Sequence, residues 1–271
     1  INKEEFAKNY QDYGLQESIE KDDTSLSYLY RARKDFFILM LDSNSHGTNE
    51  ISDQTFSWIE EILKDAKEQD IQVLAVSHQN LLAHNPYFTE GFLIHRAQEL
   101  EALYEKYDVM ANLSGHIHIQ HIEDSGLPEI LTSALPVSPH HYGILEFDGK
   151  TLDYQAKILD VASWAREQGL IDQNLLDFSQ ASRAFIEQVS ARKLESELLD
   201  SQLTSLEREL LLQTFAKLNA DYFAGRQIDP ANHQQGLSLM QETGQSFYLT
   251  YIDSILKSAE KGHEIFRLEL E

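Results

Sequence analysis

The pattern of hydrophobic and polar positions changes repeatedly between residues 35 and 160, switching from strand-like to helix-like and back. Continuous apolar runs that end in polar turns predict buried strands at residues 36–41, 71–76 and 109–113. Apolar residues that recur on one face predict helices at residues 54–69, which Asp53 can cap, and 94–106. Alternation of this kind is typical of a layered α/β region with a β-sheet core and flanking helices.

The remaining pattern divides the chain in two. Residues 130–154 contain Gly, Pro and alternating apolar positions, which predict strands and turns with a hairpin at Asp148-Gly149. From Val161 onward strand signals give way to long helical patterns, with three principal helices and a turn near Asp229-Pro230. We therefore predict an α/β domain over residues 1–160 and an all-α helical domain over residues 161–271.

Composition and charge exclude several classes of protein. The 271 residues are 42% hydrophobic, enough for a packed core, and none is Cys, which excludes disulfide scaffolds, zinc ribbons and thiol nucleophiles. Lys and Arg total 22 against 45 Asp and Glu, so the net charge of -23 argues against a nucleic-acid polymer as partner. No run of roughly 20 apolar residues predicts a membrane segment, and the chain begins at Ile1 without a signal-peptide pattern.

The histidines carry the main chemical signal. Nine of the 11 fall between His46 and His141, several of them just after predicted buried strands, where α/β enzymes place ligands. His116 and His118 stand two residues apart after one strand, and His78 follows the neighbouring strand. Neutral imidazole nitrogen is a good ligand for zinc, manganese or iron. The sequence therefore indicates a metal site with His78, His116 and His118 as candidate ligands.

The two segments AVSHQN and LSGHIH, with a helix between them, together resemble the later motifs of the calcineurin-like metallophosphoesterase family. The resemblance covers residues 25–155. It implies a dinuclear centre in which His78 and His116 bind one ion and His118 the other. Gln79 occupies a position that many family members fill with a second histidine.

The early motifs of that family are absent from the chain: Asp-x-His, Gly-Asp-x-x-Asp and Gly-Asn-His. We therefore expect an N-terminal half of the catalytic domain upstream of Ile1 or on a second chain. The resemblance places the general acid in that half, so no catalytic acid is named here. Three neutral imidazoles cannot offset two divalent cations about 3.5–4 Å apart, and we expect the chain to be inactive alone.

Further residues are candidates for substrate contacts. His140 and His141 stand in a loop that the family brings near its metal centre, and a surface position for this pair is the alternative. Asn44 follows a buried strand and is a third candidate, with a role in the turn as its alternative. We interpret three other histidines as packing or surface groups: His84, His95 and His121.

The function favoured by these features is a metal-dependent phosphoesterase. The appended helical domain and the Gly-His-Ile-His context are similar to bacterial relatives of the cyclic-nucleotide phosphodiesterase branch. This resemblance implies two divalent ions (Mn, Fe or Zn), a small phosphate-ester substrate such as a cyclic nucleotide, and phosphodiester hydrolysis by an activated water.

Two other functions stay open. The helical half could be a non-catalytic interaction or dimerisation module, because an incomplete α/β domain would expose apolar surface. A mononuclear zinc hydrolase would need a carboxylate ligand from this chain, such as Asp42. Both a cytoplasmic and an exported location stay open as well, since an export signal would lie upstream of Ile1.

Overall fold

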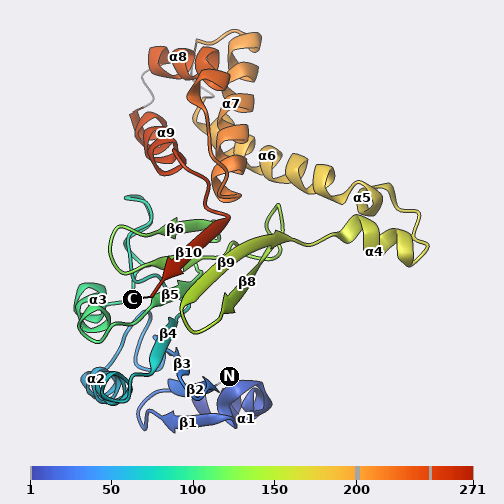
Figure 1. The fold of residues 1–271 in the computed structure, drawn as a ribbon. Coiled ribbons are helices and arrows are strands. Elements are labelled where there is room, and N and C mark those ends of the chain that lie inside the picture. Colours follow the sequence, from blue (N-terminus) through green and yellow to red (C-terminus); the bar gives the residue numbers. More distant parts are fainter. Residues whose placement is uncertain (1, 199–201, 244–245, 271) are drawn as a thin grey trace.

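The computed structural model describes residues 2–198, 202–243 and 246–270, and these residues form two β-sheets (Figure 1). The larger sheet has seven strands in the order β1-β2-β3-β4-β5-β7-β6. Its strands are β1 (Ser18–Lys21), β2 (Tyr28–Arg33), β3 (Phe36–Met40), β4 (Gln72–Val76), β5 (Ala111–Ser114), β6 (His121–Glu123) and β7 (Glu129–Leu131). The smaller sheet has the order β10-β9-β8, from β8 (His141–Phe147), β9 (Thr151–Ile158) and β10 (Ile265–Glu269).

The centre of the larger sheet is parallel. β3 pairs with β4, β4 with β5 and β5 with β7 in parallel register. A parallel pair needs a crossover connection, and the first two crossovers contain α2 (Asp53–Glu68) and α3 (Ala97–Lys106). The carboxyl ends of β4 and β5 therefore meet at one edge of the sheet.

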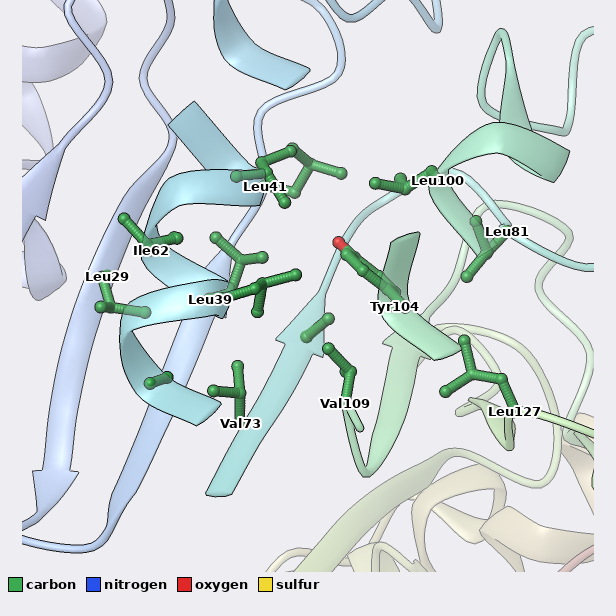
Figure 2. Close-up of a cluster of buried hydrophobic side chains, with 14 of the residues drawn as sticks. Leu29, Leu39, Leu41, Ile62, Val73, Leu81, Leu100, Tyr104, Val109 and Leu127 are labelled. Carbon is green, nitrogen blue, oxygen red and sulfur yellow. The ribbon is translucent and has the colours of Figure 1, made fainter. Parts of the chain in front are cut away.

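Alternating side chains of these strands build the main core on the helical face of the sheet. Leu39 of β3 and Val73 of β4 pack in one cluster with Ile62 of α2 and with Leu100 and Tyr104 of α3 (Figure 2). The continuous apolar sequences of β3 and β4 are explained by burial on both faces. The central strands thus form the middle layer of the α/β region.

The smaller sheet covers the opposite face. Leu74 and Met110 are buried against Leu152 of β9, with Leu145 of β8 and Leu268 of β10 packed alongside. Helices on one face and a second sheet on the other give the three layers seen in Figure 1. The predicted fold class, a layered α/β core followed by helices, is confirmed.

The helical part forms a separate cluster around α7 and α9, far from α1 in Figure 1. Leu211, Phe215 and Ile255 pack there with Ile117 and Ile119, which follow β5. The helices are α1 (Lys3–Asn9) near the N-terminus and, after β9, α4 (Val161–Glu167), α5 (Gln173–Leu176), α6 (Phe178–Glu197), α7 (Ser205–Phe223), α8 (Gln234–Thr243) and α9 (Ser246–Ser258). Two short helical turns complete them, a π turn at Gln11–Leu15 and a 3₁₀ turn at Pro230–His233. In the described part of the chain no helix combines the length and apolarity needed to cross a bilayer.

Two helix starts differ from the prediction. Ser52, not Asp53, caps α2, because the Ser52 hydroxyl accepts a hydrogen bond from Thr55 N while Asp53 already lies in the first turn. α3 begins at Ala97 rather than at residue 94. Ile94 N donates to Asn80 O at 2.9 Å, so residue 94 is held by the loop after β4 instead of starting the helix.

The chain does not stay helical to its end, which the sequence pattern did not predict. β10 pairs antiparallel with β9, with Phe266 opposite Tyr154 and Leu268 opposite Leu152. A five-residue strand with alternating exposure gives a weak local signal, and its position depends on a partner more than a hundred residues earlier. The last described residues therefore belong to the sheet and tie the helical part to it.

Candidate metal-binding site

His78 and His116 lie at the same edge of the large sheet. Each follows the last residue of its strand by two positions, and the strands β4 and β5 are parallel neighbours. Gly115 N donates to His78 O at 3.1 Å and joins the two loops directly. The predicted convergence of these two histidines is therefore present in the fold.

The two rings face each other through ring nitrogens. His116 Nδ1 lies 3.1 Å from His78 Nε2, and the ring centroids are 4.9 Å apart at an interplanar angle of 75°. His116 Nε2 lies 3.2 Å from the carbonyl oxygen of Gly91, to which it donates. This contact leaves the lone pair of His116 Nδ1 directed at His78, and a second hydrogen bond of this type commonly orients a metal-binding imidazole.

This spacing fits two ligands of one ion. Two nitrogens at about 2.0–2.1 Å from a tetrahedral zinc ion lie roughly 3.3 Å apart, close to the observed separation of 3.1 Å. Within residues 2–198, 202–243 and 246–270, however, no group of three or more His, Asp or Glu side chains is arranged to hold a metal. The pair thus fits part of a metal site, and the described residues do not provide the donor set of two ions.

His118 is exposed and His116 is half-buried. Ile117 and Ile119, which alternate with them along the chain, are buried under the helical part. Although the His78 side chain is exposed, partial desolvation and then the neighbouring charges of His116 and His118 lower its pKa. A lowered pKa favours the neutral imidazole, which is the form that binds metals. The assignment of His118 as a ligand of a second ion stays a prediction.

The backbone at these histidines adopts a conformation that non-glycine residues rarely use. The φ angles are 61° at His116, 66° at His118 and 68° at His140. Left-handed backbone at such residues costs about 1–3 kcal/mol and clusters at functional sites. Burial of Ile117 and Ile119 explains how the fold maintains this conformation at the first two positions.

Gln79 binds the loop that contains Asn44. The Ser43 hydroxyl and Asn44 Nδ2 both donate to Gln79 Oε1, the latter at 3.2 Å, and Gln79 Nε2 donates to Asn44 Oδ1 at 3.3 Å. Gln79 is 3% exposed and so is a structural link rather than an open ligand. Asn44 and His78 line one cavity of about 790 Å³, together with the aromatic residues Phe6, Tyr10, Tyr13 and Tyr28.

Asp42 uses its carboxylate to close a turn. Its oxygens accept hydrogen bonds from Leu26 N and Asn44 N, both at 2.9 Å, and from the Ser45 hydroxyl. These donors occupy the group that a mononuclear zinc site would require. The structure gives that alternative no support.

His140 and His141 are buried rather than on a surface loop. His140 is 9% exposed, donates from Nδ1 to Leu135 O at 2.9 Å and packs against Phe178, with the ring centroids 4.6 Å apart. His141 is 1% exposed, and its Nδ1 lies 3.3 Å from Ser133 Oγ. Burial, followed by the charges of Arg226 and His140, lowers the pKa of His141 to about 4. The surface alternative is wrong because the start of α6 covers this loop, and the substrate-binding role stays a prediction.

Two other histidines are core groups, as the packing interpretation expected. His84 and His121 are each 4% exposed, and their Nδ1 atoms lie 2.8 Å apart, whereas His95 is exposed. Sequence reasoning missed the residue beside them, Glu129, which is fully buried. An acidic residue inside the short apolar run Pro128-Glu129-Ile130-Leu131 is the signal that could have identified it.

Comparison with known proteins finds a family match for the helical part. Residues 160–262 match the family described as the C-terminal domain of cyclic nucleotide phosphodiesterase. The match covers less than half of the chain. It confirms the resemblance to the cyclic-nucleotide phosphodiesterase branch for this segment. No curated protein sequence matches the chain.

Similar solved structures are more distant. A crystal structure of a dimetal phosphatase from Danio rerio is 12% identical over 58% of this chain and 65% of its own, with a TM-score of 0.48. GAP50, the anchor in the inner membrane complex of Plasmodium, is 12% identical over 55% of this chain and 57% of its own, with a TM-score of 0.39. The chain spans less than two thirds of the length of either protein.

Proposed function

We propose that this chain is part of a metal-dependent phosphoesterase that hydrolyses phosphodiesters. The observation that carries the proposal is the pair His78 and His116, with facing ring nitrogens 3.1 Å apart at the carboxyl edge of two parallel strands. The match of residues 160–262 to the C-terminal domain of cyclic nucleotide phosphodiesterase supports it. Small phosphodiesters, cyclic nucleotides among them, are the proposed substrates.

The proposed centre is shared between this chain and donors outside it. His78 and His116 would hold one divalent ion, and His118 would contribute to a second. Bound Mn, Fe or Zn ions would supply an activated water and would polarise the phosphate. Carboxylate donors from an N-terminal half or a second chain would complete the set, so we expect the chain alone to be inactive.

The chain's own residues prepare this site in three ways. The carbonyl of Gly91 orients the His116 ring, and the lowered pKa of His78 favours its neutral form. Gln79 holds Asn44 at the mouth of the cavity that His78 lines. The aromatic side chains of that cavity would contact the organic part of an ester, while Asn44 would hydrogen-bond its polar groups.

The test compares the present chain with a longer chain that includes the upstream coding sequence of its gene. With Mn²⁺ and bis-p-nitrophenyl phosphate or a cyclic nucleotide, we expect turnover by the longer chain and none by residues 1–271. His116→Ala in the longer chain should abolish turnover, whereas His95→Ala, at an exposed histidine, should leave it unchanged. Normal turnover by His116→Ala would overturn the assignment.

The surface of the helical part favours a second, non-catalytic function. Trp164 is 51% exposed, Ile171 92% and Phe185 68%, and α4 and α5 extend away from the sheets in Figure 1. Exposed apolar side chains that lie together in one patch are typical of docking surfaces. For this function we expect self-association or partner binding that is lost when Trp164 and Phe185 are both replaced by Ser, as measured by light scattering. A strictly monomeric chain without a partner would contradict it.

A further inference from the structure

Glu129 lies at the centre of a buried hydrogen-bond network behind the two histidine loops. Its side chain is 0% exposed. One oxygen, Oε1, accepts from Leu81 N at 2.8 Å, from Asn112 Nδ2 at 2.7 Å and from Ser114 Oγ at 2.6 Å. The other, Oε2, accepts from Leu82 N at 2.5 Å and faces His84 Nε2 at 3.1 Å.

The donors come from both loops of the candidate metal site. Leu81 and Leu82 follow His78 by three and four residues, and Ser114 precedes His116 by two. A single carboxylate therefore binds the chain beyond one histidine and before the other.

A second bridge between the loops depends on the same carboxylate. Asn80 Nδ2 donates to Ser114 Oγ at 3.0 Å and to Gly115 O at 3.1 Å. The Ser114 hydroxyl can accept from Asn80 because its own hydrogen is donated to Glu129. The carboxylate thus sets the direction of the hydrogen bonds that connect the two loops.

The same group also begins a hydrogen-bond chain to the helical part. A carboxylate only accepts, so His84 donates from Nε2 to Glu129 Oε2 across 3.1 Å. His84 Nδ1 lies 2.8 Å from His121 Nδ1, and His121 Nε2 lies 2.7 Å from the Ser258 hydroxyl. Glu129 is therefore linked through two imidazoles to the last residue of α9.

A buried carboxylate with this many donors is costly to alter. Charge taken out of water is compensated only when the surrounding groups are fully paired with it. Replacement of the carboxylate by an amide leaves one backbone amide of the His78 loop, that of Leu81 or Leu82, without an acceptor, and such a buried group is strongly unfavourable. We expect the loop to move in order to recover partners.

We propose that Glu129 is a positioning residue that holds the loops of His78 and His116 in register. The proposal rests on the proposed function only in taking His78 and His116 as a metal-binding pair. The geometry itself is a property of the metal-free chain.

The test measures that geometry without metal or substrate. Glu129→Gln keeps the size of the side chain but turns one acceptor into a donor that faces other donors. Its matched control is Glu123→Gln. Glu123 lies opposite Glu129 in the pairing of β6 with β7. The Glu123 side chain is partly exposed, and the one hydrogen bond described for its carboxylate comes from Ser125 N. In NMR spectra of the metal-free protein, we expect the cross-peak between the His78 and His116 rings in wild type and Glu123→Gln, and its loss in Glu129→Gln.

A milder variant covers the case in which Glu129→Gln does not fold. Ser114→Ala removes one donor and the bridge through Asn80, and should weaken the same cross-peak. An unchanged cross-peak in folded Glu129→Gln, or in Ser114→Ala when the first variant is unfolded, would overturn the proposal.

Turnover then separates the two proposals. In the longer, active chain Glu129→Gln should lower kcat/KM by about 100-fold, since a misplacement of about 1 Å has an effect of that size, while Glu123→Gln should not. If wild type neither binds Mn²⁺ nor hydrolyses phosphodiesters, the proposed function fails, and the cross-peaks still decide whether Glu129 positions the loops.

Discussion

Two histidine clusters of this protein lie close together in the fold and are built in opposite ways. The open pair, His78 and His116, stands at the edge of the large sheet, and His78 is exposed. The buried cluster, His84, His121 and His263, is 3–4% exposed and lies between the sheet and α9. Both clusters consist of histidines close to the large sheet. The difference between them therefore comes from the residues that surround each ring.

The difference lies in the burial of the paired ring nitrogens. In the buried cluster the Nδ1 atoms of His84 and His121 face each other, and their Nε2 atoms face Glu129 and Ser258. His263 stacks on His121 at 3.9 Å, and both its nitrogens face backbone groups. In the open pair His116 Nδ1 faces His78 Nε2 and His116 Nε2 donates to Gly91 O, but His78 is exposed and His116 has left-handed backbone. Paired and fully buried rings indicate a structural role, whereas an accessible pair with left-handed backbone at one member indicates chemistry.

Acid should destabilise the fold through two buried histidines, His121 of the buried cluster and His141 outside it. Burial, followed by the charges of His263, His84 and Lys261, lowers the pKa of His121 to about 2, and the pKa of His141 is lowered to about 4. Below the ordinary value of 6.5 the unfolded chain binds protons at these two residues and the folded chain does not. The free energy of unfolding should fall by about 2 kcal/mol per histidine, or about 4 kcal/mol together, from about pH 7.5 to pH 5. Urea unfolding at both pH values measures this, and His121→Phe should lose about half of the effect.

Truncation of one histidine from each cluster should give unequal losses. His121→Ala removes the ring stacked on His263 and the hydrogen-bond partner of His84 Nδ1 and of the Ser258 hydroxyl, at a cost of about 3 kcal/mol in the free energy of unfolding. His116→Ala should change it by less than about 0.5 kcal/mol, as is usual for substitutions outside the core. Equal losses in urea unfolding would contradict the distinction between the clusters.

Ser258 tests whether the hydrogen-bond chain to α9 stabilises the fold. Ser258→Ala removes the hydroxyl that pairs with His121 Nε2 and leaves a buried nitrogen unpaired. We expect a loss of about 2 kcal/mol in the free energy of unfolding. Ser196→Ala, at an exposed position of α6, is the control and should have little effect on the free energy of unfolding. If Ser258→Ala leaves the free energy of unfolding unchanged, the hydrogen-bond chain to α9 does not stabilise the fold.

Binding of a divalent metal at the open pair should have the smallest of these effects on the free energy of unfolding. At a free concentration ten times the dissociation constant, Mn²⁺ or Zn²⁺ bound at the open pair stabilises the chain by about 1.4 kcal/mol. Thermal unfolding with and without metal should show this increment in wild type and in Ser258→Ala, and not in His116→Ala. An increment that survives His116→Ala would place the ion elsewhere.

Much of the α/β region was predictable because its signals are local. The strands β3, β4 and β5 and the helices α2 and α3 all have apolar patterns that can be recognised in short windows. From the strands alone, parallel neighbours bring His78 and His116 to one edge. The identification of the histidine pair therefore needed only strand ends and residue type.

Other features depended on contacts between distant segments. β10 forms because β9 offers it an edge, and the burial of His140 depends on Phe178. Glu129 stands out locally only as an acidic residue in a short apolar run, and its hydrogen-bond donors lie in two loops up to 48 residues away. The partners of such a group have no local signature, since only folding brings them together.

The sequence by itself determined the order of strands and helices in the α/β region and the residues able to bind a metal. Tertiary structure decided which histidines are paired and which are left open, because the pairing of a polar atom depends on burial and on neighbours from remote parts of the chain. It also brought the last strand back to the sheet and placed a carboxylate between two loops. Those contacts separate a structural histidine from one available for chemistry.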